Sequence, residues 1–324
     1  MKPALSVILF TVLSGAGLGA LALVALADIA SHATPQPLVA DPVALTVSAI
    51  GLALVVAGLC ASTLHLANPR NAWRSLTRWR SSWLSREALA AFLFAPITLA
   101  YFGVIAWGIP GVRALLAVLV AVLAWVMLYC TAMIYASLKP IRQWHTRRVP
   151  LGFWLLAQAT GALLIVVATA MRSSPGAGWI GLTLAFFAIA FVAKLEYWHF
   201  VRGTDGGVTL GRAIGVEQGV VPARHADNGR TVAARLLDVG HTKGTFLTRE
   251  FLHTPSAAGR RALRTVAIVA GFGIPSLWLV AGDADWRGGI AAFIACLVGL
   301  LAERWLFFAE ARHTVRLYHG EART

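Results

Sequence analysis

STLHLANPRNAWRSLTRWRSSWLSRE, residues 62–87, joins two long apolar segments of the chain. It contains five arginines, three tryptophans and one histidine. Arginine near a bilayer pairs with lipid phosphates, and tryptophan concentrates at the membrane–water interface. The stretch is therefore predicted to be a loop at the membrane surface between two transmembrane helices.

The simplest interpretation of this loop is an interfacial anchor made of positive charge and an aromatic belt. That interpretation leaves two residues unexplained: His65, at the end of the preceding apolar segment, and Glu87, at the start of the next. Ionisable groups at such depths are costly and are often functional. Both residues are therefore candidates for a site.

Composition places the chain among polytopic membrane proteins. Its 324 residues are 58% hydrophobic and 13% charged, about half the charge of an ordinary soluble domain. Apolar stretches long enough to cross a bilayer recur along the chain. We expect an all-α fold and one integral membrane domain over residues 1–324, with eight transmembrane helices at approximately 4–29, 44–66, 87–109, 114–138, 151–172, 178–200, 263–282 and 287–309.

Basic residues lie mostly on one side of the predicted bundle. The connections 67–86, 139–150 and 201–262, with the two termini, hold 22 lysines and arginines, against 3 on the other side. By the positive-inside rule, the basic side and both termini are expected to be cytoplasmic. The formal charge of +14 then points to anionic lipids or an acidic protein partner rather than nucleic acid.

The connection 201–262 is the one large segment outside the predicted spans. It begins Gly-rich and becomes basic, and it is too short and polar to form a catalytic domain with its own core. Phe246, Leu247, Phe251 and Leu252 provide apolar contacts that a plain linker would lack. We expect a cytoplasmic docking loop, with a flexible linker as the alternative.

Metal and haem sites are not favoured by the sequence. The three cysteines lie inside apolar segments without a CxxC pattern, so the chain is not expected to ligate an iron–sulfur cluster. His65 and His199 stand at the ends of apolar spans on the same side and are the one pair available to a b-type haem. Both lie at the rim, so we expect no bound haem and no metal site.

A second group of polar residues occupies the last turns of the sixth and eighth predicted spans. Lys194, Glu196 and His199 lie on the sixth, with Glu196 and His199 three residues apart and on one face. Glu303 lies on the eighth. Two interpretations remain open: an internal ion pair, such as Glu303 with Lys194, or a proton path from the cytoplasm through these four residues.

An aromatic and polar pocket at the membrane rim, with a histidine and a carboxylate, suits a quinone. The headgroup carbonyls need hydrogen-bond donors, and quinone reduction needs protons, which histidine can relay near neutral pH. Apolar flanks would accept the isoprenoid tail. This pattern is compatible with a quinone but is not specific to it.

Three stretches resemble the membrane anchor subunits of the dimethyl sulfoxide reductase family: LHLANPRNAWRSLTRWRSSWLSRE (64–87), YASLKPIRQWHTRRVPLGF (135–153) and LDVGHTKGTFLTREF (237–251). The resemblance implies an eight-helix membrane subunit of a molybdenum enzyme, without haem or iron–sulfur cluster of its own. It implies electron exchange between a quinone, ubiquinone or menaquinone, and a four-cluster iron–sulfur subunit. That partner in turn connects to a molybdopterin catalytic subunit.

The resemblance also assigns candidate site residues. The quinol-site histidine of the family matches His65, and a glutamate at the start of the next helix matches Glu87. The family commonly has Pro-x-Arg-Ala after the histidine, whereas this chain has Pro69-Arg70-Asn71-Ala72, so Arg70 or Arg74 stands in for that arginine. The expected quinone-binding residues are His65, Arg70, Arg74, Trp83 and Glu87.

The long 201–262 connection and the WRSSWLSRE sequence resemble the membrane subunits of cytoplasmic sulfite dehydrogenases more than the dimethyl sulfoxide reductase anchor. We therefore expect electrons to pass from sulfite to quinone, with a quinol-oxidising anchor of a terminal reductase as the alternative. Two other classes remain, a purely structural anchor and a transporter. The transporter would need Gly/Pro breaks in two related halves; Pro96 and Pro275 are mid-span, but no repeat relates the halves.

Overall fold

The structure is a computed structural model that describes residues 3–31, 33–63, 69–204, 208–209, 220–221, 232–233, 255–281 and 285–319. Within these ranges, side chains are not described for residues 69–72, 75, 220–221, 232–233 and 318–319.

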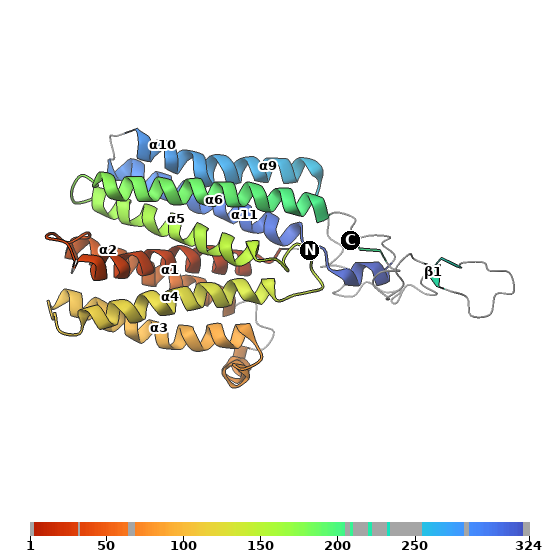
Figure 1. Cartoon of the computed structure of the whole chain (residues 1–324), viewed down its shortest axis with the longest axis horizontal. Coiled ribbons are helices and arrows are strands. Elements are labelled where there is room, and N and C mark those ends of the chain that lie inside the picture. The colour runs from red at the N-terminus through yellow and green to blue at the C-terminus, as the bar shows by residue number, and fades with distance from the viewer. Residues whose placement is uncertain are drawn as a thin grey trace.

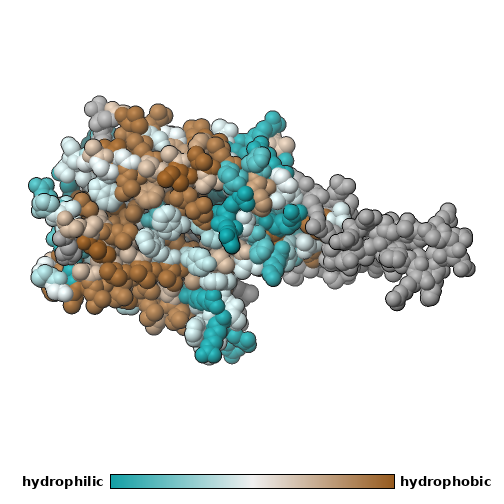
Figure 2. Space-filling view, viewed as in Figure 1, coloured by the Kyte–Doolittle hydropathy of each residue, from teal (hydrophilic) through white to brown (hydrophobic). Residues whose placement is uncertain are grey.

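Eight helices in the described part of the chain are long and apolar enough to span a membrane, which confirms the all-α polytopic fold. They run along one another in a single bundle (Figure 1). Figure 2 shows apolar residues over its flank and a run of hydrophilic residues near the end where both termini lie. The spans are α1 (Leu5–Ser31), α2 (Asp41–Thr63), α3 (Trp83–Ala106), α4 (Arg113–Ala136), α5 (Arg148–Ala170), α6 (Ala177–Thr204), the composite α9 (Ala257–Ile268), η2 (Val269–Gly273) and α10 (Ile274–Val280), and α11 (Trp286–Ala309).

Helix α3 begins earlier than the apolar pattern predicts. The Ser82 side chain caps it by accepting a hydrogen bond from the Ser85 N–H at 3.4 Å, as serine commonly does at a helix N-terminus. The η1 helix (Pro69–Arg78) precedes this cap. The expectation that Glu87 opens the helix is therefore wrong: Glu87 lies in the second turn, one turn deeper in the bundle.

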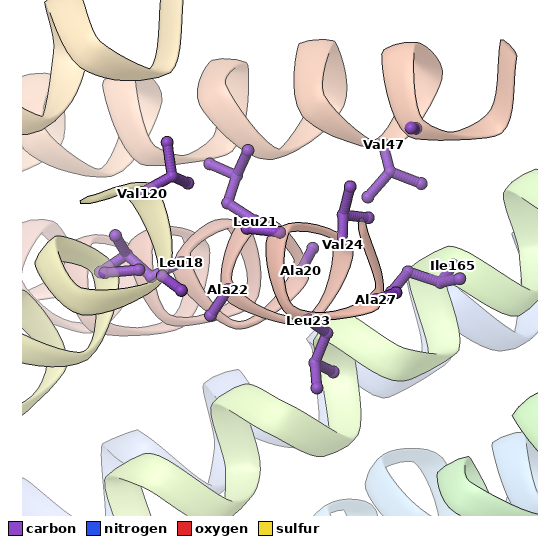
Figure 3. Close-up of a cluster of buried hydrophobic side chains, with 14 of the residues drawn as sticks. Leu18, Ala20, Leu21, Ala22, Leu23, Val24, Ala27, Val47, Val120 and Ile165 are labelled. Atoms are coloured by element: carbon purple, nitrogen blue, oxygen red, sulfur yellow. The ribbon is translucent and has the colours of Figure 1, made fainter. Parts of the chain in front are cut away.

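Helix α1 forms the centre of the bundle. It packs against α2, α4, α5 and α11, and 78% of its most apolar window is buried, against 22% for α6. Figure 3 shows its side chains pointing toward Val47 of α2, Val120 of α4 and Ile165 of α5. Helix α1 is thus enclosed by four of the other described spans.

Glycines let α1 and α5 approach closely. A methyl group at Gly19 would overlap the backbone of Ala157, and one at Gly161 would overlap the backbone of Ala20. Gly15 and Gly19 form a GxxxG pair in the sequence, a spacing that predicts packing against a neighbouring helix, and Gly19 does contact one. Gly15 faces open space, so the small-residue contact pairs Gly19 with Gly161 across two helices.

The seventh span is irregular. Its α9 and α10 segments are joined by the π-helical turn η2, which comes just before Pro275. Proline lacks the N–H that continues the helical ladder, and a π turn accommodates such an interruption. Gly271 in this turn lies against Gly299 of α11, where a methyl group on Gly299 would overlap the backbone.

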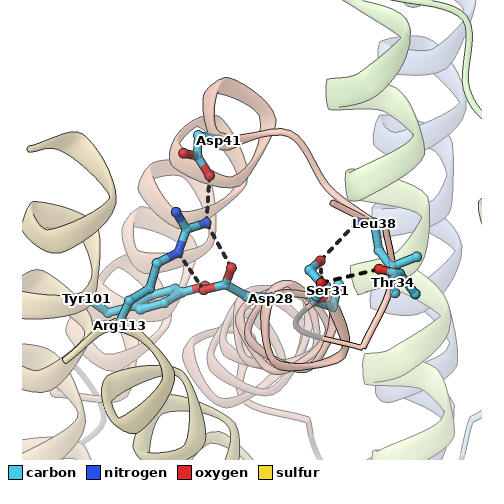
Figure 4. Close-up of polar contacts among 8 residues, drawn as sticks. Asp28, Ser31, Thr34, Leu38, Asp41, Tyr101 and Arg113 are labelled. Carbon is cyan, nitrogen blue, oxygen red and sulfur yellow. Dashed lines mark hydrogen bonds and ion pairs between the residues drawn. The ribbon is translucent and has the colours of Figure 1, made fainter. Parts of the chain in front are cut away.

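The less basic end of the bundle is joined by one polar cluster (Figure 4). Arg113 of α4 binds Asp28 of α1 at 2.8 Å and Asp41 of α2 at 2.6 Å, and Tyr101 of α3 donates a hydrogen bond to Asp28 at 3.1 Å. Four helices therefore meet at Asp28 and Arg113.

In the 201–262 connection, the structure describes the end of α6, a two-residue antiparallel pair between β1 (Val220–Val221) and β2 (Val232–Ala233), and the start of α9. Most of the predicted docking loop lies outside the described residues. After α11 the chain forms the short η3 helix (Thr314–His319) at the same end as the α6 C-terminus.

Candidate functional site

Only part of the predicted quinone site lies where side chains are described. His65 is outside the described residues, and Arg70 lies in η1 without a described side chain. Arg74 is exposed and its guanidinium lies 5.7 Å from the centre of the Trp73 ring. Trp83 and Glu87 stand in the first two turns of α3, so the described site is built on these two residues.

Glu87 is a buried carboxyl group, with 3% of the residue exposed. Its Oε1 contacts the Thr131 hydroxyl of α4, and among the described residues no cation forms an ion pair with it. Thr131 also lies 2.9 Å from the Met127 carbonyl. A threonine hydroxyl has a single hydrogen, so Thr131 can donate to Met127 while it accepts from a protonated Glu87.

Arg86, the neighbour of Glu87, is held away from that carboxyl. Its Nε donates to the Trp79 carbonyl at 2.9 Å and its Nη2 to the Arg80 carbonyl at 2.8 Å. Its guanidinium also lies 4.2 Å from the centre of the Trp83 ring. These contacts join the end of the 62–87 stretch to the start of α3. Arg86 therefore forms no ion pair with Glu87, whose described hydrogen-bond partner is Thr131.

An apolar groove of about 690 Å³ runs between α3 and α4 at this end of the bundle. Trp83 and Tyr129 lie edge to face across it, with ring centres 5.6 Å apart. Glu87 and Thr131 do not line the groove themselves, but their neighbours do: Ala90, one turn beyond Glu87, and Cys130, next to Thr131, are part of its wall. The complete lining is Trp79, Trp83, Arg86, Leu89, Ala90, Leu93, Val122, Leu123, Trp125, Val126, Tyr129 and Cys130.

A second hollow of about 570 Å³ adjoins the groove, and Tyr129 lines both. His145 and Arg147 line it from the connection between α4 and α5. His145 Nδ1 lies 2.7 Å from the Ala136 carbonyl, and Nδ1 is the donor of this hydrogen bond because a carbonyl oxygen can only accept. No pattern in the sequence marks His145 as a site residue, although it lies in the quoted 135–153 stretch.

A buried ionic cluster lies between α6 and α11. Glu303, fully buried, contacts the Lys194 ammonium, and its Oε2 lies 2.6 Å from Arg304 Nε. This contact confirms the internal ion pair that the sequence analysis named as one interpretation. The Arg304 guanidinium also lies 3.9 Å from the centre of the Phe153 ring.

The four residues of the predicted proton path are divided by the fold. Lys194 and Glu303 form the buried pair, whereas Glu196 and His199 lie together on the exposed face of α6. Glu196 binds Arg148, with Nη2 to Oε1 at 2.7 Å. A path through all four residues would have to pass from one face of α6 to the other.

Aromatic rings lie between the two buried carboxyl groups. Tyr135, one turn beyond Thr131 on α4, stacks with Phe153 at 5.8 Å between ring centres and meets Phe307 edge to face at 5.6 Å. Phe153 lies under Arg304. Glu87 and Glu303 therefore belong to two different polar sites, with a layer of packed aromatic side chains between them.

Within the described residues, no group of three or more His, Cys, Asp or Glu side chains is arranged to hold a metal ion. Cys60, Cys130 and Cys296 are free thiols. The polar residues described here offer hydrogen bonds and protons.

Fold and site together define a polytopic membrane subunit with a buried carboxyl group beside an aromatic groove at its basic rim. The sequence profile of the DMSO reductase anchor subunit (DmsC) family matches residues 1–309, and the chain belongs to that family. This result confirms the resemblance drawn from the 64–87, 135–153 and 237–251 stretches.

Two curated relatives refine the assignment. The C subunit of the sulfite dehydrogenase of Allochromatium vinosum is 34% identical over an alignment of 337 positions, which covers 98% of this chain and 99% of the relative. The C component of the anaerobic dimethyl sulfoxide reductase of Escherichia coli K12 is 30% identical over 114 residues, 33% of this chain and 38% of the relative. No solved structure matches significantly.

Proposed function

We propose that the chain is the quinone-reactive membrane anchor of a heterotrimeric molybdopterin/iron–sulfur oxidoreductase. In this function it holds the complex on the membrane and passes electrons from the iron–sulfur subunit to a membrane quinone, in sulfite oxidation. The observation that carries the proposal is the buried carboxyl of Glu87, whose neighbours on α3 line the α3/α4 groove.

The groove has the shape and lining that a quinone needs. Its wall is almost wholly apolar, which suits an isoprenoid tail, and Trp83 and Tyr129 offer ring faces to a flat headgroup at the rim. Its walls belong to two membrane spans, α3 and α4, so a lipid-soluble substrate would enter it from the hydrocarbon region. A bound quinone accepts two electrons and two protons when it is reduced.

Glu87 and Thr131 would manage protons in this site. A carboxyl group that is buried and lacks an ion-pair partner among the described residues can gain or lose a proton without breaking a salt bridge. Thr131 can accept from the acid and donate to the Met127 carbonyl, which holds the carboxyl in one orientation. His65 would donate a hydrogen bond to a headgroup carbonyl, and Arg70 or Arg74 would add positive charge.

The partners would bind at the basic end of the bundle. The iron–sulfur subunit must bring its nearest cluster within electron-transfer reach of the quinone, because this chain is expected to hold no redox group of its own. The 22-to-3 distribution of lysine and arginine supports a cytoplasmic location for this end and for the catalytic subunit, in a bacterial inner membrane.

Sulfite is the favoured substrate of the complex because the sulfite dehydrogenase relative covers nearly the whole length of both proteins. The second candidate is a quinol-oxidising anchor of a reductase of the dimethyl sulfoxide type, supported by the partial match to that relative. The two functions use one site and differ in the direction of electron flow.

The test compares Glu87→Gln and His65→Ala complexes with a Glu196→Gln control, which removes an exposed carboxylate outside the groove. The two site variants should assemble and oxidise sulfite with an artificial acceptor but lose most of their activity with quinone. The control should keep both activities. Normal quinone turnover in both site variants would show that the site is wrongly assigned.

A further inference from the structure

One stripe of α4 side chains passes through both the α3/α4 groove and the hollow of about 570 Å³ that adjoins it. Its members recur every three or four residues, which is the spacing of a single helix face. The first three line the groove and the last three line the hollow: Val122, Val126, Tyr129, Met133 and Ala136. The two hollows therefore follow one another along about 21 Å of α4, at about 1.5 Å per residue.

Three polar side chains of the hollow have hydrogen-bonding groups without a partner among the described residues. His145 uses Nδ1 to donate to the Ala136 carbonyl at 2.7 Å, and no described residue forms a hydrogen bond with its Nε2. The Tyr129 hydroxyl and the Arg147 guanidinium likewise form no hydrogen bond or ion pair within the described part of the chain. The hollow thus offers an imidazole, a phenol and a guanidinium to an occupant.

The charge of this lining favours a neutral occupant over a phospholipid headgroup. Arg147 is its one cation, and no carboxylate is among the described residues that line it. The neighbouring Arg148 lies outside the lining and is paired with Glu196 at 2.7 Å. Sites for anionic lipids are typically clusters of several basic residues. One cation with two uncharged polar groups suits instead an uncharged ring that carries oxygen atoms.

The contact with Ala136 leaves Nε2 of His145 as the nitrogen available to a ligand. In the neutral imidazole Nδ1 carries the hydrogen, so Nε2 accepts and can bind the hydroxyl of a quinol. In the protonated imidazole Nε2 donates and can bind the carbonyl of a quinone. His145 can therefore form a hydrogen bond with a headgroup oxygen in either redox state.

We propose that the quinone headgroup lies in this hollow, where His145 Nε2 forms a hydrogen bond with one of its oxygens. The isoprenoid tail then follows the α4 stripe through the groove, along Val126 and Val122. Glu87 acts on the headgroup from α3, and His145 holds it from the connection between α4 and α5. This inference rests on the proposed function and adds a binding residue to the same site.

Asparagine and glutamine at position 145 separate the roles of the two ring nitrogens. The amide of His145→Asn lies near the position of Nδ1, so it can keep the hydrogen bond to Ala136 but not the one to the headgroup. The amide of His145→Gln reaches the position of Nε2, so it can keep the headgroup contact and loses the one to Ala136. The control is Arg142→Gln, because Arg142 is exposed in the same connection and lines neither hollow.

The first measurement is steady-state kinetics of the intact purified complex with sulfite and decylubiquinone or menadione, whichever the wild type reduces faster. His145→Asn should raise the KM for this quinone about tenfold, from the loss of one hydrogen bond, with a smaller change in kcat. His145→Gln and the control should keep a KM near that of the wild type. Activity with an artificial acceptor should be unchanged in all of them.

The second measurement locates the headgroup without turnover. A quinone with a photoreactive azide on its ring, irradiated with the wild-type complex, should label a proteolytic fragment within residues 129–150. Excess decylubiquinone or menadione should prevent this labelling, and phosphatidylglycerol should not.

A normal KM in His145→Asn, or an impaired His145→Gln beside a normal His145→Asn, would overturn the inference, because the second pattern is that of a purely structural histidine. Loss of quinone turnover in Glu87→Gln would in that case leave the proposed function standing. Failure of the quinone to label any part of the chain would overturn both. Protection of residues 129–150 by phosphatidylglycerol and not by quinone would assign the hollow to a lipid, and the inference would be wrong.

Discussion

Replacing Glu303 by glutamine should destabilise the bundle far more than replacing Lys194 by methionine. Among the described residues, Glu303 is the one carboxylate that forms an ion pair with Lys194 or Arg304, and all three residues are almost completely buried. The change Glu303→Gln leaves two cations facing a neutral amide. The change Lys194→Met leaves Glu303 paired with Arg304 at 2.6 Å, which is a neutral pair.

The magnitudes follow from charge balance. Removing one partner from a buried ion pair costs about 3–5 kcal/mol, because the remaining charge is left uncompensated. Replacing a buried charge by an apolar side chain of similar length while the rest stays neutral is expected to cost within about 1 kcal/mol. Membrane domains with stabilities of about 5–15 kcal/mol would lose a large share in the first case.

The assay is thermal unfolding of the purified complex in detergent, followed by size-exclusion chromatography at fixed lipid and protein concentration. Glu196→Gln serves as the control, because the Arg148–Glu196 pair has side chains 41% and 48% exposed and is expected to contribute less than about 1 kcal/mol. An equal loss of stability in Glu303→Gln and Lys194→Met, or a greater loss in Lys194→Met, would refute the charge-balance reasoning.

Three further predictions concern other parts of the bundle. Gly19→Val should prevent accumulation of the protein, because its side chain would overlap the backbone of Ala157; Gly15→Val, which faces open space, is the control, and equal membrane yields would contradict the close approach. Asp28→Asn should lower the thermal midpoint more than Asp285→Asn, because it leaves Arg113 with only one of its two carboxylates; an unchanged midpoint would contradict this. Burial lowers the pKa of His313, so the folded protein favours its neutral form. The free energy of unfolding should therefore be highest above the ordinary pKa range of histidine and should decrease as the pH falls through about 6.5, where the unfolded chain takes up the proton first. His313→Gln should flatten that acid slope in thermal unfolding measured across the range, and an unchanged slope would exclude His313 as its source.

The spans were predictable because long apolar runs have a single physical explanation in a chain of this composition. The ends of the spans were harder to predict. Ser82 and Trp83 are not apolar enough to be counted in a span by hydropathy, yet Ser82 caps α3 and the helix begins at Trp83, so Glu87 lies one turn inside it. Hydropathy likewise gives no sign of the π turn before Pro275, which depends on how α9 and α11 pack at Gly271 and Gly299.

For the candidate site, the sequence identified unusual ionisable residues but not how they are arranged in space. Burial of an ionisable side chain picked out Glu87, Lys194 and Glu303, and the Lys194–Glu303 contact was one of the two interpretations offered. Glu196 is separated from that pair because only the Lys194 face of α6 is turned toward Glu303 of α11. The spacing of residues within one helix does not reveal which face packs against another helix. Thr131 is an ordinary threonine in an apolar run, so nothing in the sequence identifies it as the partner of Glu87.

The central position of α1 has a consequence for how the bundle is made. A protein is synthesised from its N-terminal side, so α1 reaches the bilayer before α4, α5 and α11, which later cover it. Until then its glycine surface faces lipid, and any other membrane helix with a small-residue stripe can compete for it. The eighth span completes the enclosure, so truncation before α11 should yield a protein recognised by quality-control proteases even though seven apolar helices have inserted.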